Sequence, residues 1–274
     1  MMFLRWYRLI NILSLDVVAG AVINALYFAK VFQVMIRPYA LIALALSVWI
    51  IYTADHLWDA KKIGKHAASR RHRFHQKYFK VLSMLLMICI VLNAVMIFFI
   101  RPAVFFAGII LLFFIAAYHL VQRKLHYAKE IFVACLYATG ILLPSVTVTP
   151  PERITAFHIV LIVAFFFVCL LNLFIFSWFD AERDVSDRLG SFVTRFGKER
   201  TARIIRGLFL AAVSAAVASF FVGPESIAAI FPLAMSLVLM IIFSFPQYFE
   251  HRENYRLLGD AVFVLPLIYL LCAC

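Results

Sequence analysis

The sequence predicts an all-α membrane protein that crosses the bilayer about nine times. First, 65% of the 274 residues are hydrophobic and only 15% are charged, so too few polar side chains are available to cover a soluble domain of this length. Second, apolar runs long enough to span a bilayer recur along the whole chain. No polar or low-complexity stretch separates two regions, so we expect residues 1–274 to form one transmembrane domain without a soluble appendage.

The first three spans are delimited by charged residues and by one helix breaker. The first covers about residues 10–29. Two arginines precede it, as in a signal peptide, but Asp16 interrupts the apolar run and further spans follow, so we expect an uncleaved helix. The second span starts after Pro38 and runs to about Trp58, and the third covers about residues 79–99.

Prolines mark the boundaries of the middle spans. Arg101-Pro102 forms the turn into the fourth span, which ends near Val121. The fifth runs from about residue 130 to 148 and is closed by two consecutive prolines, because proline cannot continue a helix. The sixth span occupies about residues 156–179.

The last three spans complete the predicted nine-helix topology. The seventh covers about residues 204–222. The eighth covers about residues 226–246 and lies between Pro224 and Pro246. The ninth covers about residues 257–273, at the end of the sequence.

Lysine and arginine are distributed unevenly between the two sides that these spans define. With the N-terminus in the cytosol, the cytosolic segments hold two, eight, three, seven and two of them in chain order, which is 22 of the 26. Only Lys30, Arg37, Arg101 and Arg153 fall outside. This alternation obeys the positive-inside rule and predicts a cytoplasmic N-terminus. The net charge of +12 then reflects topology and anionic headgroups, so we expect membrane lipids as partners and no nucleic acid.

Aspartates gather at the cytoplasmic ends of two predicted helices. Asp55 and Asp59 end the second span, and Asp180 and Asp184, followed by Asp187, end the sixth. A spacing of four residues places each pair of carboxylates on one helix face, and we expect Asp187 to continue the face of the second pair. The two motifs are four spans apart, in matching topological positions, which suggests a weak internal duplication.

Two carboxylate pairs beside basic loops are suited to a specific ligand. Mg²⁺ prefers oxygen ligands and commonly takes one or two carboxylates together with substrate phosphates. The competing interpretation is that each motif is a set of interfacial aspartates paired with nearby cations, since structural ion pairs imitate sites. Two motifs in equivalent positions favour function, because acidic groups at membrane depth are costly.

The motifs and their flanking sequence resemble the UbiA superfamily of intramembrane prenyltransferases. The resemblance runs from about Pro38 to Ile205. It includes both aspartate motifs and three further segments, namely Tyr118 with Arg123-Lys124, residues 129–144, and residues 190–200. The resemblance implies helices around a central cavity, Mg²⁺ as cofactor, a prenyl diphosphate as substrate, and prenyl transfer to a lipophilic, usually aromatic, acceptor.

The resemblance also assigns candidate site residues. The candidate metal ligands are Asp55, Asp59, Asp180, Asp184 and Asp187. The candidate diphosphate-binding residues are Arg123, Lys124 and Arg195. No residue is assigned as the base that activates the acceptor. The resemblance further implies a multi-pass protein of a bacterial inner membrane.

Three features leave alternatives open. Position 51, four residues before the first aspartate, is usually Asn in this superfamily and is Ile51 here, so a non-catalytic relative that binds an isoprenoid or lipid is an alternative. A transporter ranks last among the candidate functions. Transporters place their binding residues near the bilayer midplane, whereas the aspartate motifs here lie at the cytoplasmic ends of the predicted helices. Asp16 and Asp260 either line the same cavity or pair with neighbouring cations, and Asn172 either faces the site or bonds another helix.

Overall fold

The long helices of the protein are apolar enough to form a membrane-embedded bundle. The computed structural model describes residues 2–63, 67–121, 128–187, 190–223 and 226–272, and none of these residues lies in a β-strand. By length and composition, seven described helices could cross a membrane, or eight if a bent N-terminal pair counts as one span. The predicted all-α membrane protein is therefore confirmed, while nine spans and a cytoplasmic N-terminus stay predictions.

The two helices that carry the aspartate motifs are longer than their predicted spans. α3 (Pro38–Ile63) and α8 (Ala156–Ser186) each continue past the apolar segment. Asp55, Asp59, Asp180 and Asp184 therefore lie on regular helix, and each pair shares a face as the spacing predicts. Asp187 follows the last residue of α8 as its C-cap.

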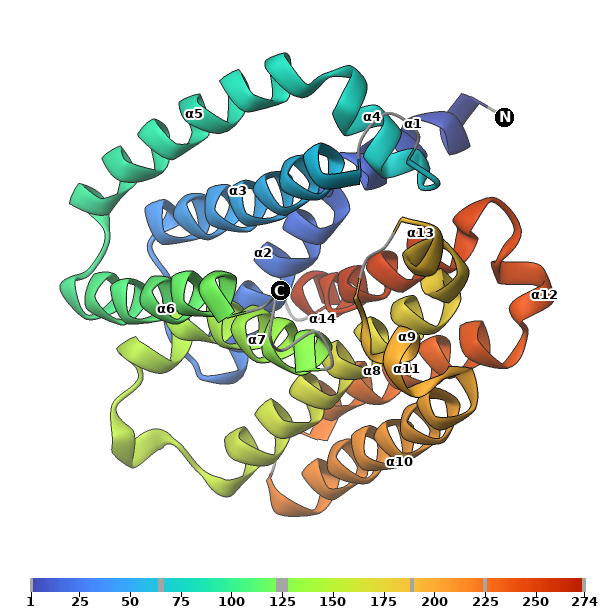
Figure 1. Cartoon of the computed structure of the whole chain (residues 1–274). Helices are drawn as coiled ribbons and strands as arrows, with labels where there is room; N and C mark the ends of the chain where they lie inside the picture. Colours follow the sequence, from blue (N-terminus) through green and yellow to red (C-terminus); the bar gives the residue numbers. More distant parts are fainter. Residues whose placement is uncertain (1, 64–66, 122–127, 188–189, 224–225, 273–274) are drawn as a thin grey trace.

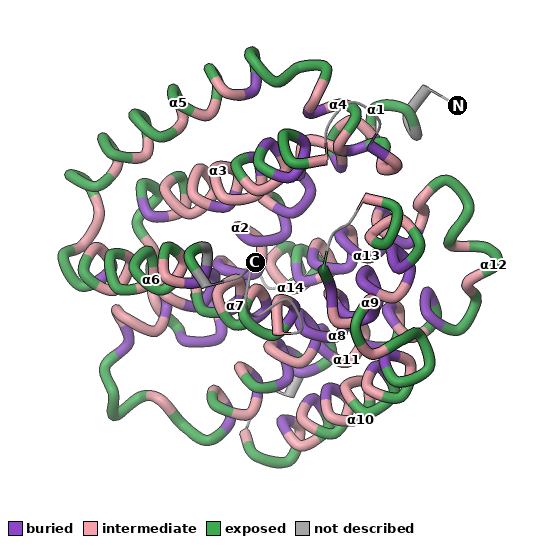
Figure 2. Tube along the Cα trace, in the orientation of Figure 1, coloured by how far each residue is buried: buried purple, intermediate pink, exposed green. Residues whose placement is uncertain are grey.

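α8 lies at the centre of the bundle (Figure 1). It packs against α7 (Lys129–Val148), α10 (Lys198–Val222) and α11 (Ser226–Ser244). Half of its residues are buried, including Leu161, Leu171 and Ile175 with no exposed surface. Figure 2 shows buried residues concentrated on these central helices.

Two helices at the edge of the bundle are largely exposed. α5 (Phe79–Met96) packs on α3 and contributes one buried residue, Leu82, and a short 3₁₀ helix, η1 (Ile97–Phe99), follows it. α6 (Pro102–Val121) packs on α7. Figure 2 shows that both helices are largely exposed. Their exposed residues are mostly large and apolar, as expected for helices that face lipid.

The first predicted span is a bent pair of helices, so the prediction of one continuous helix over residues 10–29 was wrong. α1 (Met2–Ile12) and α2 (Leu15–Val31) meet at 76°. Ser14 between them has a left-handed backbone, with φ of 56°. The bend places Asp16 in the first turn of α2, where the helix dipole favours a carboxylate.

Short helices complete the fold. α4 (Arg70–Lys77) and α9 (Phe192–Phe196) follow the two aspartate motifs, and η3 (Pro151–Arg153) precedes α8. The predicted ninth span is irregular, because Pro266 cannot continue a helix ladder. The C-terminal elements are α12 (Pro246–Phe249), η4 (His251–Glu253), α13 (Asn254–Ala261), η5 (Val262–Val264) and α14 (Leu267–Cys272).

Candidate functional site

A cavity of about 520 Å³ runs between the helices that carry the aspartate motifs. Its walls come mainly from α3, α6, α7 and α8, with further residues from α4 and α13. Along α3 the lining extends from Ala40 to Asp59, which corresponds to about 28 Å of helix. The cavity is therefore long, and its two ends differ in chemistry.

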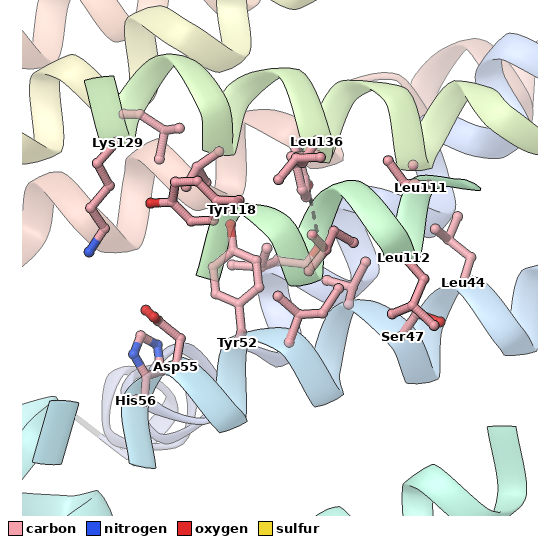
Figure 3. Close-up of a pocket in the computed structure, with 18 of the residues that line it drawn as sticks. Leu44, Ser47, Tyr52, Asp55, His56, Leu111, Leu112, Tyr118, Lys129 and Leu136 are labelled. Atoms are coloured by element: carbon pink, nitrogen blue, oxygen red, sulfur yellow. Dashed lines mark hydrogen bonds between the residues drawn. The ribbon is translucent and has the colours of Figure 1, made fainter. Parts of the chain in front are cut away.

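One part of the cavity is apolar. Figure 3 shows Leu44, Leu111 and Leu112 at the end away from Asp55. The polar contact there is between Ser47 and Asn93, whose amide donates to the serine hydroxyl at 2.9 Å. Ile51, the position at which the sequence departs from the superfamily pattern, also lines the wall.

The first aspartate motif lines the polar end. Asp55 and Asp59 both face the cavity from α3. The ammonium of Lys129, at the start of α7, points toward the Asp55 carboxylate (Figure 3), and it also interacts electrostatically with Asp59 and Asp184. Lys62 lies 3.7 Å from Asp59 on the same helix. Lys129 thus places a positive charge near carboxylates of both motifs.

The second aspartate motif lines the opposite wall and is already bound to cations. Asp180 accepts hydrogen bonds from Tyr255 and Arg256 of α13, and from Arg183 at 3.3 Å. Asp184 lines the cavity one turn further on and interacts with Ser191. The structure brings Asp55, Asp59, Asp180 and Asp184 to a single cavity, as expected.

Asp187 contacts a neighbouring segment and not the cavity. Its carboxylate accepts the backbone N–H of Ala68 at 2.9 Å and lies 3.5 Å from His72. Asp187 is absent from the cavity walls formed by the described residues. It therefore fastens the segment before α4 to the end of α8.

α4 covers the polar end and supplies its own basic groups. Arg71 and His72 line the cavity, and Arg71 also approaches His56 at 3.3 Å. Burial lowers the pKa of His72 despite the nearby carboxylates of Asp59 and Asp187. His72 is therefore neutral near pH 7, and Arg71 is the permanent cation of α4 at the cavity.

The basic residues predicted for the diphosphate are not placed at the cavity by the structure. Arg123 and Lys124 lie outside the described residues. Arg195 is exposed, stacks on the Phe196 ring at 5.8 Å, and is absent from the described cavity walls. The cations found there are Lys129, Arg71 and Arg256.

These three cations were missed as site residues for different reasons. Lys129 belongs to a segment quoted for the resemblance, but its role was not assigned. Arg71 and Arg256 were counted only as topology signals. The spacing of Arg256 and Asp260, one helical turn apart, would have indicated a shared face.

The donor set is compatible with Mg²⁺ and a diphosphate. Among the described residues, the cavity lining holds six acidic and three basic side chains. With all of them ionised, the lining would carry an excess of negative charge that a divalent cation would offset. No three His, Cys, Asp or Glu side chains of the described residues converge closely enough to hold a metal ion by themselves. Mg²⁺ does not require this, because it usually keeps waters and takes ligands from substrate phosphates.

Comparisons with known proteins identify the fold. No family model and no curated protein matches the sequence. A UbiA homolog from Archaeoglobus fulgidus, solved bound to DMAPP and Mg²⁺, superposes with a TM-score of 0.63 at 15% identity over 94% of this chain and 98% of that chain. The apo structure of a UbiA homolog from Aeropyrum pernix K1 gives 0.66 at 15% identity over 95% and 98%. The resemblance to the superfamily is therefore confirmed at the level of the fold: the chain has a divergent UbiA-like fold and is a multi-pass integral membrane protein.

Proposed function

We propose that the protein transfers a prenyl group from a prenyl diphosphate to an aromatic or other lipophilic acceptor, with Mg²⁺ as cofactor. The transfer takes place at the cytoplasmic side of a bacterial inner membrane, within one transmembrane domain. The observation that carries the proposal is the shape of the cavity. Four aspartates from two helices meet at one end, and a long apolar wall continues from them.

This division of the cavity matches an amphiphilic substrate. A diphosphate at the polar end lies within reach of the cationic side chains of Lys129, Arg71 and Arg256, which form charge-assisted hydrogen bonds with phosphate oxygens. The hydrocarbon chain lies along the apolar lining of α3 and α6, where burial stabilises it by about 0.8 kcal/mol per methylene. The UbiA homolog from Archaeoglobus fulgidus, bound to DMAPP and Mg²⁺, supports the same assignment.

The metal ligands are Asp55, Asp59, Asp180 and Asp184. Mg²⁺, when bound, neutralises charge on the departing diphosphate as a Lewis acid. The protein residues position the diphosphate and keep water from the allylic carbon. Asp187 is left out of the ligand set, because its carboxylate is bonded to Ala68 and His72.

The test is binding of geranylgeranyl diphosphate to the detergent-purified protein, with and without Mg²⁺. We expect binding that requires Mg²⁺ and is lost in Asp59→Asn and in Asp180→Asn, both of which should remain folded and inserted. Glu152→Gln is the matched control, since Glu152 is an exposed carboxylate in η3. Full binding in either aspartate variant would refute the metal-site assignment.

A second candidate function is binding of an isoprenoid or lipid without catalysis. Two observations favour it: Ile51 replaces a polar side chain on the cavity wall, and Asp180 is bonded to Arg256. The same experiment separates the two functions. Binding of geranylgeraniol without Mg²⁺, together with no Mg²⁺-dependent binding of its diphosphate, would favour the second candidate.

A further inference from the structure

Four buried polar side chains from four elements meet beside the cavity. They are Asn11 of α1, Asp16 of α2, Arg71 of α4 and Asp260 of α13, and each is at most 7% exposed. The amide nitrogen of Asn11 donates to the carboxylates of Asp16 at 2.5 Å and Asp260 at 2.8 Å. The two carboxylates therefore face each other across one amide group.

Arg71 fixes the orientation of that amide. Its guanidinium donates to the side-chain oxygen of Asn11 at 3.2 Å and to its backbone carbonyl at 3.1 Å. Arginine can only donate, so the Asn11 oxygen must face Arg71 and the nitrogen must face the acids. The cluster is thus a directed network that holds the Asp260 carboxylate in one place.

Asp260 faces the cavity, whereas Asp16 does not. Of the two aspartates, Asp260 is the one that lines the cavity. Its Oδ2 accepts from Asn11, while Oδ1 accepts no hydrogen bond from any described residue. Asp260 also lies one helical turn, about 6 Å along α13, from Arg256, whose side chain contacts Asp180 of the second aspartate motif.

An independent feature beside Asp260 points to a missing ligand. Asn172 is 5% exposed, and its buried Oδ1 has no hydrogen-bond partner among the described residues. A Cβ built on Gly259 would lie 2.8 Å from this oxygen, so Asn172 is adjacent to the Gly259–Asp260 stretch. A buried polar atom without a partner is costly and is normally satisfied by water or by a ligand.

Asn172 and Asp260 also share a small void of about 20 Å³ that adjoins the main cavity. Tyr52 and Tyr137 contribute to both spaces, as does the apolar side chain of Leu173. This recess is therefore bounded by polar tips and by aromatic and aliphatic surface. Such a boundary suits an acceptor with a flat apolar body and a polar substituent.

We propose that Asp260 and Asn172 form the subsite for the prenyl acceptor, that this acceptor carries a hydroxyl group, and that Asp260 is the catalytic base. This inference rests on the proposed prenyltransferase function. Both groups are hydrogen-bond acceptors, so they select a ligand that donates. As the carbon–oxygen bond of the prenyl diphosphate breaks, the diphosphate leaves with its electron pair. The acceptor oxygen forms the new bond to the prenyl carbon as its O–H bond breaks, and the proton passes to the Asp260 carboxylate.

A purely structural role for Asp260 explains the cluster less well. Arg71 contacts Asn11 and not the carboxylates, so neither acid has a direct hydrogen-bonded ion pair with a described cation. Burying two carboxylates at membrane depth without such a cation costs free energy. A structural cluster also leaves the unpaired oxygen of Asn172 unexplained.

The test compares 2-naphthol with 2-methoxynaphthalene, which has the same rings but no hydroxyl proton. Each is titrated by fluorescence into the full chain loaded with Mg²⁺ and geranylgeranyl thiolodiphosphate, a poorly reactive analogue. We expect 2-naphthol to bind the wild-type protein at least about tenfold more tightly than 2-methoxynaphthalene does. This is the value of a hydrogen bond to a charged group. We also expect naphtholate emission from the bound probe, because its excited state transfers a proton to a nearby base.

Two variants and a control decide the outcome. Asp260→Asn should abolish both the preference and the naphtholate emission, and Asn172→Ala should reduce the preference. Glu152→Gln is the control and should keep both, because Glu152 is exposed in η3 and is absent from the described cavity walls. Equal binding of the two probes to wild type, or unchanged emission in Asp260→Asn, would overturn the proposal.

Failure of the proposed function is recognised separately on the same samples. Mg²⁺-dependent binding of geranylgeranyl diphosphate reports the metal site and does not involve Asp260. If that binding is present and the naphthol preference is absent, the acceptor subsite is wrong and the prenyltransferase proposal stands. If Mg²⁺-dependent binding is absent, the prenyltransferase proposal is refuted, and with it the catalytic role of Asp260.

Discussion

Arg256 of α13 donates a hydrogen bond to the carboxylate of Asp180, the first aspartate of the second motif. The bond joins residues 76 positions apart and places a guanidinium against Asp180, a candidate metal ligand. A carboxylate that accepts from Arg256, Tyr255 and Arg183 has less lone-pair capacity for a cation. Binding of Mg²⁺ at this wall would therefore compete with the contacts of α13.

The first prediction concerns this competition. Arg256→Met should raise the affinity for Mg²⁺ measured without diphosphate by about tenfold, because the variant removes a like charge and a competing donor from Asp180. Isothermal titration calorimetry of the purified protein with MgCl₂ measures this affinity. Arg200→Met is the matched control, since Arg200 is exposed on α10 and does not line the cavity. An affinity that is unchanged or lower in Arg256→Met would contradict the competition.

The second prediction concerns Lys129 as a diphosphate ligand. Lys129→Met should weaken Mg²⁺-dependent binding of geranylgeranyl diphosphate by about tenfold to a hundredfold, the value of a charge-assisted hydrogen bond. Binding of geranylgeraniol should not change, because the alcohol carries no phosphate. Lys30→Met is the control, since Lys30 contacts Tyr269 and is absent from the described cavity lining. Equal losses of affinity for the diphosphate and for the alcohol would indicate a general packing defect.

The third prediction concerns the length of the prenyl chain. A Cβ built on Gly108 of α6 meets no atom within 4 Å, although Gly108 lines the apolar part of the cavity. Gly108→Phe should therefore fill this space and weaken binding of geranylgeranyl diphosphate by about tenfold or more, since buried methylenes contribute about 0.8 kcal/mol each. Binding of dimethylallyl diphosphate should change little.

The control for this prediction lies on the same helix. Ile110→Phe places the same ring on the exposed side of α6, where Ile110 is 59% exposed. It should leave the binding of both diphosphates unchanged. A Gly108→Phe variant that binds the long and short diphosphates with wild-type affinities would show that the chain does not follow the apolar wall of α6.

The fourth prediction concerns the close approach of α8 and α13. A Cβ on Gly259 would lie 2.5 Å from Cε1 of Phe176 and 2.8 Å from the side-chain oxygen of Asn172. Gly259→Ala should therefore destabilise the protein by about 1–3 kcal/mol through overpacking. Gly207→Ala on α10 is the matched control, because its Cβ meets no atom within 4 Å. It should stabilise the protein by about 0.5–1 kcal/mol. Thermal unfolding in detergent measures both, and equal midpoints would contradict the prediction.

The sequence by itself determined the helices and the two aspartate motifs. In lipid a backbone must satisfy its hydrogen bonds within its own helix, so apolar runs and prolines locate the spans directly. The same local rule placed Asp55 with Asp59, and Asp180 with Asp184, on shared helix faces. The rule failed at Ser14, because the hydropathy of the sequence does not indicate a left-handed backbone. It also failed at Asp187, which follows the end of α8 instead of continuing its face.

Only the tertiary structure decided which distant residues share the cavity. The contacts of Asp180 with Arg256, and of Asp260 with Asn11 249 positions away, depend on how helices pack. Helix packing follows from the shapes of many side chains at once, which no short segment of sequence encodes. The same holds for Lys129, whose position between the two motifs follows from α7 packing beside α3 and α8. The sequence therefore supplied the candidate metal ligands, and the packing supplied their cationic partners and the proposed acceptor subsite.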